Sequence, residues 1–596
     1  MSTRPRPNTF DPRLRLLWLA AVLVACGFTL VARAAWLQLV STSFYQQQGD
    51  ARFVREVPIV ASRGSILDRN GETLAASSPV ASVWANPREL LGHPERLPEL
   101  GRALSIAPEE LARRVSERAD REFVYLRRHM NPDEAAAVIG LGIPGVHQQR
   151  EFRRFYPHGE VMAHVLGFTN IDDQGQEGLE LAFDGWLTGK PGLKRIVRDR
   201  QGRIIDDVDL VRPAEPGRDL VLAIDRRVQY LAYRELKAAI ARHQARSGSV
   251  VVLDIPSGEI VAMVNQPSYN PNARGSGDGA ARRNRAVTDL IEPGSVIKAM
   301  TVAAAMENGA DPTRQINTSP GFFPLRNHTI RDVNNYGMVD MTRLLMKSSN
   351  IAATKLALEM SNEHFHDVLS RFGYGQGTGS GFPGEATGVL PPPRRWGEVV
   401  KATISYGYGL SATPLQIAQS YAVLANEGRM LPPTFVKGGN AAAPRGRQVI
   451  DPHIARSVVG MLETVVAPGG TATTAAVAGY RVAGKTGTTR QSVPGGYQQR
   501  YVSVFAGIVP VQQPRFAMVV AIHDPSAGRF YGGQVAAPVF HSVMDGALRL
   551  MDVPPDNVRQ WFATAPKAAP AELGSDGLVP MDAPPVAQAQ PAGGLP

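Results

Sequence analysis

Ser295-Val296-Ile297-Lys298 is the stretch that decides the fold and the chemistry of this chain. Two further motifs follow it, Ser348-Ser349-Asn350 and Lys485-Thr486-Gly487-Thr488. They supply a serine nucleophile with a nearby lysine, a second hydroxyl, and a cationic strand that can hold a carboxylate. Each motif alone carries little information. Together, in this order, they indicate acyl transfer on a peptide.

The first motif has the spacing that a serine and its base need. Residues three apart share one face of a helix, so Ser295 and Lys298 meet if a helix begins here. The residues from Val296 to Asn308 are rich in Ala, Met and Val, and Gly309 follows where a helix would end. Ser295 would then lie at the positive end of that helix. Lys298 can act as the base only when it is neutral, which burial and neighbouring cations favour.

The second motif falls between two helical stretches, residues 342–347 and 351–359. We predict that Ser348 relays a proton to the leaving amine and that Asn350 holds a substrate amide through its donor and acceptor groups. Ser349 is expected to contact substrate. The alternative is a helix-capping junction with no catalytic role.

The third motif is expected to be a strand, paired in a hairpin with residues 501–508. Lys485, which we also count as catalytic, would present its cation to a carboxylate. Thr486 and Thr488 would present their hydroxyls to the same carboxylate. Gly487 would let a substrate backbone lie close. The backbone N–H of Thr488 would pair with that of Ser295 as an oxyanion hole.

Two other patterns suggest different chemistry. Residues 479–486 match the phosphate-binding pattern GxxxxGK[ST], but such a loop must open a helix, and Gly487 and the threonines after it are poor helix material. His364, His366 and Asp367 could suggest a metal site, yet positions two apart on a helix point to different faces. The sequence therefore predicts no metal and no cofactor, and a surface or half-buried helix at 364–367.

The fold class expected from the pattern of elements is α+β. Strands at 248–254 and 259–265 come early, the three strands at 485–488, 501–509 and 516–522 come late, and helices lie between them. This order favours an antiparallel five-stranded sheet flanked by helices, with the nucleophile helix packed on it.

The N-terminus carries a membrane-anchor pattern. Leu16 to Ala32 is an apolar run of 17 residues, which extends to Val40 if Arg33 reaches the interface. Arginines precede the run, so we expect residues 1–15 in the cytoplasm, a transmembrane helix at 16–40 and the body outside. A cleaved signal peptide is one alternative, and lipidation at Cys26, which follows Leu23-Val24-Ala25, is another.

Composition sets wider limits. The chain has 596 residues, a net charge of +10 and one cysteine, so an intrachain disulfide is impossible. A basic chain suits a polyanionic surface; because no nucleic-acid-binding motif is present, we expect membrane and cell wall and no nucleic acid. We expect a mixed α/β pedestal at 41–215, a catalytic domain at 216–553 and a disordered Pro/Ala-rich tail at 554–596.

The three motifs resemble the SxxK, SxN and KTG signature of penicillin-recognising serine enzymes. The stretch from Arg63 to Gly71 resembles the first conserved box of class B penicillin-binding proteins. Residues 154–180, which begin Arg154-Phe155-Tyr156-Pro157, are similar to the division-specific branch, the FtsI family. The resemblance covers roughly residues 15 to 550.

This resemblance implies a penicillin-binding transpeptidase fold on an elongated pedestal, and a peptidoglycan D,D-transpeptidase of the bacterial inner membrane that acts at the septum. Ser295 would be acylated by a stem peptide ending in D-Ala-D-Ala, and β-lactams would mimic that donor. The catalytic domain would lie in the periplasm. The implied partners are a polytopic septal glycosyltransferase resembling FtsW and other membrane proteins of the divisome.

Two rival functions stay open at this point. A β-lactamase or D,D-carboxypeptidase would resolve the acyl-enzyme with water, but no Glu-x-x-Leu-Asn segment lies between Asn350 and Lys485 to supply a deacylating base. A β-lactam sensor or division scaffold without turnover would need a cytoplasmic effector domain, and 15 residues before the span cannot provide one.

Overall fold

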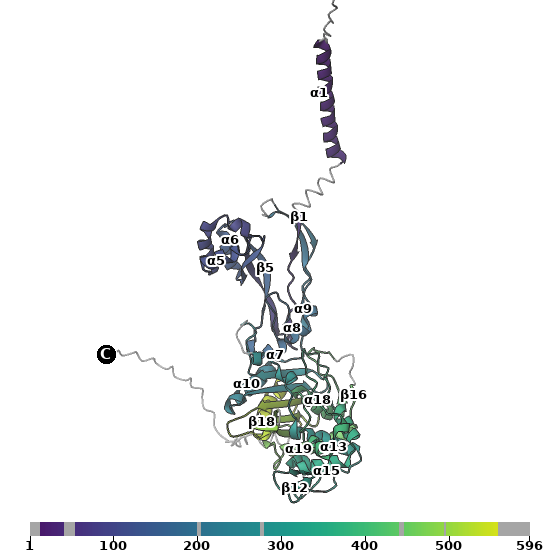
Figure 1. The fold of residues 1–596 in the computed structure, drawn as a ribbon. Helices are drawn as coiled ribbons and strands as arrows, with labels where there is room; N and C mark the ends of the chain where they lie inside the picture. Colours follow the sequence, from purple (N-terminus) through teal and green to yellow (C-terminus); the bar gives the residue numbers. More distant parts are fainter. Residues whose placement is uncertain are drawn as a thin grey trace, which may run out of the picture.

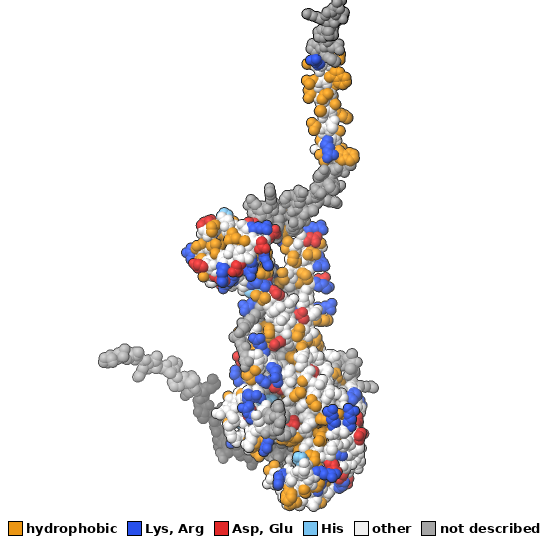
Figure 2. Space-filling model, in the orientation of Figure 1, with side chains coloured by type: hydrophobic (Ala, Val, Ile, Leu, Met, Phe, Trp, Pro, Cys, Tyr) orange, Lys and Arg blue, Asp and Glu red, His pale blue; other side chains and the backbone are white. Residues whose placement is uncertain are grey.

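The computed structural model describes residues 12–40, 54–198, 204–273, 279–439, 446–493 and 496–557. Most of the expected disordered tail (558–596 of 554–596) and most of the N-terminal tail lie outside these residues. Helix α1 (Pro12–Ala35) continues as one π-helical turn (Trp36–Val40). Apolar side chains cover the visible face of α1, with cations near both ends (Figure 2). The segment Arg13–Leu39 is long and apolar enough to cross a membrane, and none of its most apolar window is buried in protein.

Between α1 and the catalytic sheet, the chain folds into two small sheets and a cap of short helices (Figure 1). One sheet has the strand order β1-β6-β7 and the other β4-β3-β2-β8, with β5 paired to β3. The strands are β1 (Val54–Ile59), β2 (Ile66–Leu67), β3 (Thr73–Ala85), β4 (Val124–Met130), β5 (Val146–Phe155), β6 (Gly192–Arg198), β7 (Ile204–Arg212) and β8 (Leu220–Val221). The cap helices, which share a separate hydrophobic core with β3 and β4, are α3 (Pro87–Leu90), α4 (Leu97–Leu104), α5 (Pro108–Ser116) and α6 (Pro132–Gly140).

Buried charges hold the lower part of this region together. Glu180 accepts hydrogen bonds from Arg63 at 2.7 Å and from Arg154 at 2.6 Å, and the three side chains are almost fully buried. Asp68 accepts hydrogen bonds from the backbone of Asn70 and Glu72, which fixes a turn. Because an unpaired buried charge is costly, each of these side chains depends on its partners.

The catalytic region is built on a five-stranded antiparallel sheet in the order β10-β9-β19-β18-β17. The strands are β9 (Ser247–Asp254), β10 (Ile260–Gln266), β17 (Ala483–Val493), β18 (Gly496–Val509) and β19 (Phe516–His523). This confirms the predicted sheet, with two early and three late strands. Strand β9 is buried along its whole length, because helices cover both faces of the sheet.

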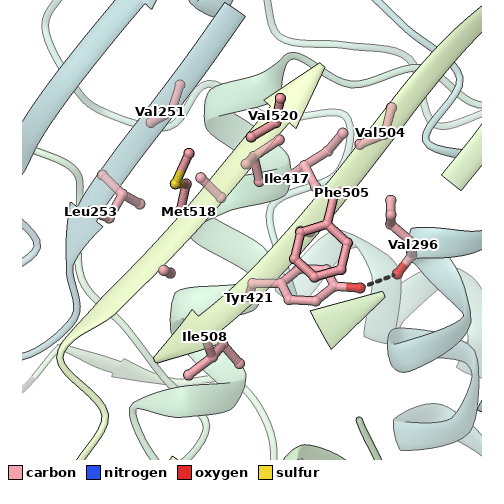
Figure 3. Packing of buried hydrophobic residues seen from close by; sticks show 14 of the residues in the cluster. Val251, Leu253, Val296, Ile417, Tyr421, Val504, Phe505, Ile508, Met518 and Val520 are labelled. Carbon is pink, nitrogen blue, oxygen red and sulfur yellow. Dashed lines mark hydrogen bonds between the residues drawn. The ribbon is translucent and has the colours of Figure 1, made fainter. Parts of the chain in front are cut away.

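Helices α10 (Arg226–Arg242) and α21 (Ala537–Leu550) pack on each other and on one face of the sheet. Helix α18 (Pro414–Ala425) packs on β9, β18 and β19 from the other side, with α19 (Pro452–Val466) against it. The phenol of Tyr421 on α18 donates a hydrogen bond to the carbonyl oxygen of Val296 at 2.9 Å (Figure 3). The hydrophobic core is thereby bonded directly to the turn that carries Ser295.

Candidate active site

The three motifs converge on one cavity of about 610 Å³. Ser295 lies in the 3₁₀ turn η4 (Gly294–Ile297), which leads into α13 (Lys298–Glu307). The second motif joins α14 (Met341–Lys347) to α15 (Asn350–Glu359), and the third lies on the edge strand β17. Five of the predicted site residues line the cavity: Ser295, Ser348, Asn350, Thr486 and Thr488.

The nucleophile turn is packed tightly against β17. Gly294 has a φ of +58°, and a Cβ at this position would lie 2.4 Å from the Thr489 side chain, so only glycine fits. The same position is 3.6 Å from the backbone nitrogen of Thr488. Ser295 follows Gly294 directly, and Ser295 and Thr488 both line the cavity; the oxyanion hole formed by their two amides stays a prediction.

Lys298 is fully buried and its ammonium nitrogen faces the second motif. Nζ donates to the carbonyl oxygen of Ser348 at 2.7 Å, to the Ser348 hydroxyl at 3.2 Å and to Oδ1 of Asn350 at 2.7 Å. Burial lowers the pKa of Lys298 well below its ordinary value, and the charge of Lys485 lowers it further. Only the ammonium can make all three bonds; the neutral amine donates at most two, and its lone pair can then accept a proton from a nearby hydroxyl.

Lys485 is also fully buried, and it does not line the cavity. Its Nζ donates to the Ser348 hydroxyl at 2.9 Å and to the Thr486 carbonyl oxygen at 3.2 Å. Burial lowers the pKa of Lys485 to about 7. The ammonium of Lys485 contacts Ser348, and Thr486 and Thr488 line the cavity; the contact of Lys485 with a substrate carboxylate stays a prediction.

Ser348 lies between the two lysines. It ends α14 in the left-handed conformation, with a φ of +61°, which is unusual for a residue other than glycine. Its hydroxyl oxygen accepts from Lys298 and from Lys485, so the hydroxyl proton stays available for a third partner in the cavity. This geometry suits proton delivery to a leaving amine.

One predicted contact with substrate, that of Ser349, is wrong, and that of Gly487 stays a prediction. The Ser349 side chain is fully buried; it caps α15 by accepting from the Ala352 amide and donates to Asp332. The helix-capping alternative is thus correct for Ser349. Gly487 does not line the cavity, and a Cβ there would lie 2.9 Å from the carbonyl oxygen of Pro293. Its lack of a side chain lets the nucleophile turn approach β17.

Asp332 is a residue that the sequence analysis missed. Its carboxylate accepts hydrogen bonds from the Ser349 hydroxyl, the Asn350 amide and the Ile351 amide at 2.6, 2.6 and 3.1 Å. It therefore holds the first turn of α15, and with it the Asn350 side chain that accepts from Lys298. Asn350 also donates from Nδ2 to the Arg331 carbonyl oxygen. The predicted hydrogen bonds to a substrate amide would therefore use the second N–H of Nδ2 and the second lone pair of Oδ1.

We expect Asp332→Asn to lower the free energy of unfolding by about 1–3 kcal/mol, because charge-assisted hydrogen bonds to the helix start are lost. Acylation by penicillin should also slow, by roughly tenfold, because Asn350 and Lys298 lose their fixed geometry. The matched control is Asp340→Asn, since Asp340 caps α14 through the Arg343 amide and contacts neither lysine. A control variant with the same acylation defect would show that any helix cap has this effect.

The phosphate-loop pattern and the histidine cluster form neither of the sites that they suggest. Lys485 and Thr486, which complete the phosphate-loop pattern, lie within strand β17 and do not open a helix. His364 and His366 are on helix α16 (Asn362–Arg371) and point to different partners, the Ala304 carbonyl oxygen and the Trp396 ring. Asp367 pairs with Arg371.

Comparisons with known proteins agree with this fold and site. The penicillin binding protein transpeptidase domain matches residues 248–545, and the penicillin-binding protein dimerisation domain matches residues 58–222. The chain is 43% identical over 542 residues to the peptidoglycan D,D-transpeptidase FtsI of Escherichia coli, covering 90% of this chain and 91% of the relative. It is 40% identical over 560 residues to the probable peptidoglycan D,D-transpeptidase PenA of Neisseria gonorrhoeae, covering 92% and 94%.

Solved structures show the same architecture. A peptidoglycan synthetase from Bifidobacterium adolescentis superimposes with a TM-score of 0.67 at 24% identity, covering 84% of this chain and 97% of that one, which supports the fold alone. The transpeptidase domain of penicillin-binding protein 3 from Burkholderia pseudomallei is 39% identical with a TM-score of 0.52, covering 56% and 97%.

The fold and the site together define a penicillin-binding transpeptidase with a penicillin-binding protein dimerisation domain before it. Within that class, the chain belongs to the FtsI family of class B penicillin-binding proteins. The family assignment made from the sequence motifs is thereby confirmed.

Proposed function

We propose that this protein is a septal peptidoglycan D,D-transpeptidase whose nucleophile is Ser295, and that β-lactams inhibit it by acylating the same residue. The observation that carries the proposal is the Ser348 hydroxyl held between Lys298 and Lys485, at the cavity that Ser295 lines. This pairing supplies both a proton acceptor for the nucleophile and a proton donor for the leaving group.

In the proposed reaction, Ser295 Oγ attacks the carbonyl carbon of the penultimate D-Ala and passes its proton to Lys298 Nζ. The oxyanion that forms is stabilised by the backbone N–H groups of Ser295 and Thr488. The Ser348 hydroxyl then protonates the leaving amine and recovers a proton from the lysines that flank it. D-Ala departs, and an ester remains on Ser295. An amine of a second stem peptide attacks that ester, returns a proton through the same groups and releases Ser295.

The acyl-enzyme formed with penicillin should persist for hours. Deacylation by water needs a general base, which is worth ~10² to 10⁴ in rate. The described residues that line the cavity include no Asp, Glu or His. The test is to label the protein with fluorescent penicillin, remove the excess and follow the bound label at neutral pH. Rapid loss of label with return of binding capacity would favour a β-lactamase-like hydrolase instead.

The membrane arrangement and the partners are part of the proposal. We place residues 1–15 in the cytoplasm, a span at 16–40, a pedestal at 41–215, the catalytic domain at 216–553 in the periplasm and a tail at 554–596. The α1 segment supports a single-pass anchor, and the arginines before it support this orientation. Glycan polymerisation would come from a polytopic septal glycosyltransferase resembling FtsW.

Single-cysteine variants can test the orientation, because Cys26 is the only cysteine in the sequence. In a Cys26→Ala background, Ser116→Cys on the exposed end of α5 should react with a membrane-impermeant maleimide in intact spheroplasts. Ser2→Cys should react only after the membrane is permeabilised. The reverse pattern would contradict the orientation, and a chain whose mature N-terminus is a lipid-modified Cys26 would replace the transmembrane anchor.

A further inference from the structure

The domain before the catalytic region holds a second hollow, a groove of about 400 Å³ that the proposed reaction does not use. One wall is a face of the sheet formed by β3, β4 and β5, and a second wall comes from the segments around β1 and β6. A volume of this size suits a small ligand or a short stretch of a chain molecule. The sheet wall includes Tyr125, Arg128, Gln149 and Glu151, and the second wall includes Pro58, Val60, Ala61 and Pro191.

A row of aromatic rings lies along this face of the sheet. Trp84 on β3 is opposite Tyr125 on β4 and His147 on β5, and directly opposite residues share one face. The Trp84 ring lies 4.6 Å from the His147 ring and 4.7 Å from the Phe123 ring, and the Phe123 ring lies 4.7 Å from that of Tyr125. Because Tyr125 lines the groove and Phe123 is exposed, the row leads from the groove onto the open surface.

Hydrogen bonds fix the polar groups of the same face. The buried carboxylate of Glu151 accepts from the Tyr125 hydroxyl at 2.8 Å, from Arg128 Nη2 at 3.0 Å and from Gln149 Nε2 at 3.0 Å. Burial raises the pKa of Tyr125 to about 12, so its phenol stays neutral. Side chains that are held before a ligand arrives lose little freedom when it binds, so this wall is pre-organised.

The charges in the groove are paired within the protein. Among the described residues that line it, the arginines are Arg63 and Arg128, and each contacts two carboxylates at 2.7 to 3.0 Å. A nucleic acid or an anionic lipid would need cations that are not already paired, and a cationic ligand would compete with the arginines for the same carboxylates. These contacts favour a ligand that is polar and uncharged.

Asp173 adds an acceptor that has no donor. It lines the groove in the left-handed conformation, with a φ of +61°, and its Oδ1 is buried without a hydrogen-bond partner among the described residues. A buried acceptor in this state is costly, and a hydroxyl or amide N–H of a ligand would satisfy it. The groove therefore favours a ligand that has hydrogen-bond donors as well as flat apolar faces.

We propose that this groove binds a neutral chain of N-acetylated sugars, which is the chemistry of the glycan strand that carries the stem peptides. A sugar ring has C–H faces that pack on aromatic rings, and its hydroxyl and acetamido groups hydrogen-bond to polar side chains. A peptide that binds by strand addition is disfavoured, because β3 is paired on both sides and the groove presents the face of the sheet. The proposal rests on the proposed function, which brings the protein to this polymer, but it does not involve the acylation of Ser295.

The experiment titrates the full-length protein in detergent with tetra-N-acetylchitotetraose and measures the dissociation constant by calorimetry. Tyr125→Leu removes a ring and a hydroxyl from the groove, whereas Val60→Trp fills the groove from its second wall. We expect each variant to bind the sugar about tenfold more weakly, because an aromatic face and a hydrogen bond are lost or blocked. Penicillin labelling should stay at the wild-type rate in both variants, since neither residue lines the catalytic cavity.

Val211→Trp is the matched control for Val60→Trp. Val211 lies on β7, in the same sheet as β1, and is 41% exposed against 47% for Val60, but it does not line the groove. It should leave sugar binding unchanged. The proposal would be overturned if the wild type bound no chitotetraose, or if Tyr125→Leu and Val60→Trp bound it as tightly as the wild type. Equally tight binding of maltotetraose would overturn the assignment to N-acetylated sugars.

A crosslinking arm tests the competing occupant, a segment of another protein. A photoreactive amino acid in place of Val60 should give adducts of high mass in intact cells, and lysozyme should digest them. A discrete adduct with another protein, unchanged by lysozyme, would overturn the proposal. A wild-type protein that binds chitotetraose but takes up no penicillin would contradict the proposed function alone.

Discussion

Ser295→Ala should take up no penicillin, whereas the wild-type protein takes up one molecule. In the proposed reaction the covalent bond forms at the hydroxyl of Ser295, a residue that lines the cavity, and alanine has no atom to replace that hydroxyl. The variant should therefore form no detectable adduct, even after long incubation, instead of forming the adduct more slowly. Intact-mass measurement after penicillin treatment, followed by peptide mapping, should place the adduct on the peptide that contains Ser295.

Ser348→Ala is the informative companion, because Ser348 is the other serine among the described residues that line the cavity. This variant should still form the adduct at Ser295, at a reduced rate, since only proton delivery is impaired. An adduct that survives in Ser295→Ala, or one that disappears in Ser348→Ala and maps to Ser348 in the wild type, would contradict the assignment of the nucleophile.

Lys298→Ala should slow acylation by ~10² to 10⁴, the usual contribution of a positioned general base. The pKa of Lys298 is lowered by burial and by Lys485, which favours the neutral amine that can accept the Ser295 proton. Acylation of the wild type should accordingly fall as the pH is lowered and Lys298 becomes protonated. The second-order rate constant for a fluorescent penicillin, measured across pH, checks both expectations.

Lys401→Ala is the matched control for the loss of a buried lysine. Lys401 on α17 (Glu398–Ser405) is also buried with a lowered pKa, and it donates to the Met360 carbonyl oxygen at 2.8 Å. Because it does not line the cavity, its loss should affect stability and leave the acylation rate close to wild type. If Lys298→Ala reacted as fast as Lys401→Ala, the base would have to be another group.

The convergence of the three motifs was predictable from the sequence because the proposed chemistry depends on residue type and local spacing. Ser295 and Lys298 share a helix turn, and the alternation in 501–509 and 516–522 gives buried strands, so the sheet and the motif placement were predictable too. Contacts between residues far apart in the sequence were not predictable from it. Asp332 reaches the start of α15 from a loop 17 residues earlier, and no local pattern marks it.

Side-chain direction was the other limit of the sequence analysis. Ser348 and Ser349 are adjacent and chemically identical, and only the left-handed backbone at Ser348 turns one hydroxyl to the lysines while the other caps a helix. The role of Gly487 likewise depends on which neighbour approaches it. In the fold, that neighbour is the Pro293 carbonyl of the nucleophile turn.

Because Tyr421 donates a hydrogen bond to Val296, the orientation of the turn that carries Ser295 depends on a residue far from the three motifs in the sequence. The two bonded residues are 125 positions apart, and the donor belongs to a helix inside the hydrophobic core. Substitutions on α18 that would ordinarily be classed as packing defects can therefore act as catalytic lesions. A survey of resistance or loss-of-function changes confined to the three motifs would overlook this helix, although a penicillin and a stem peptide depend equally on the turn that it supports.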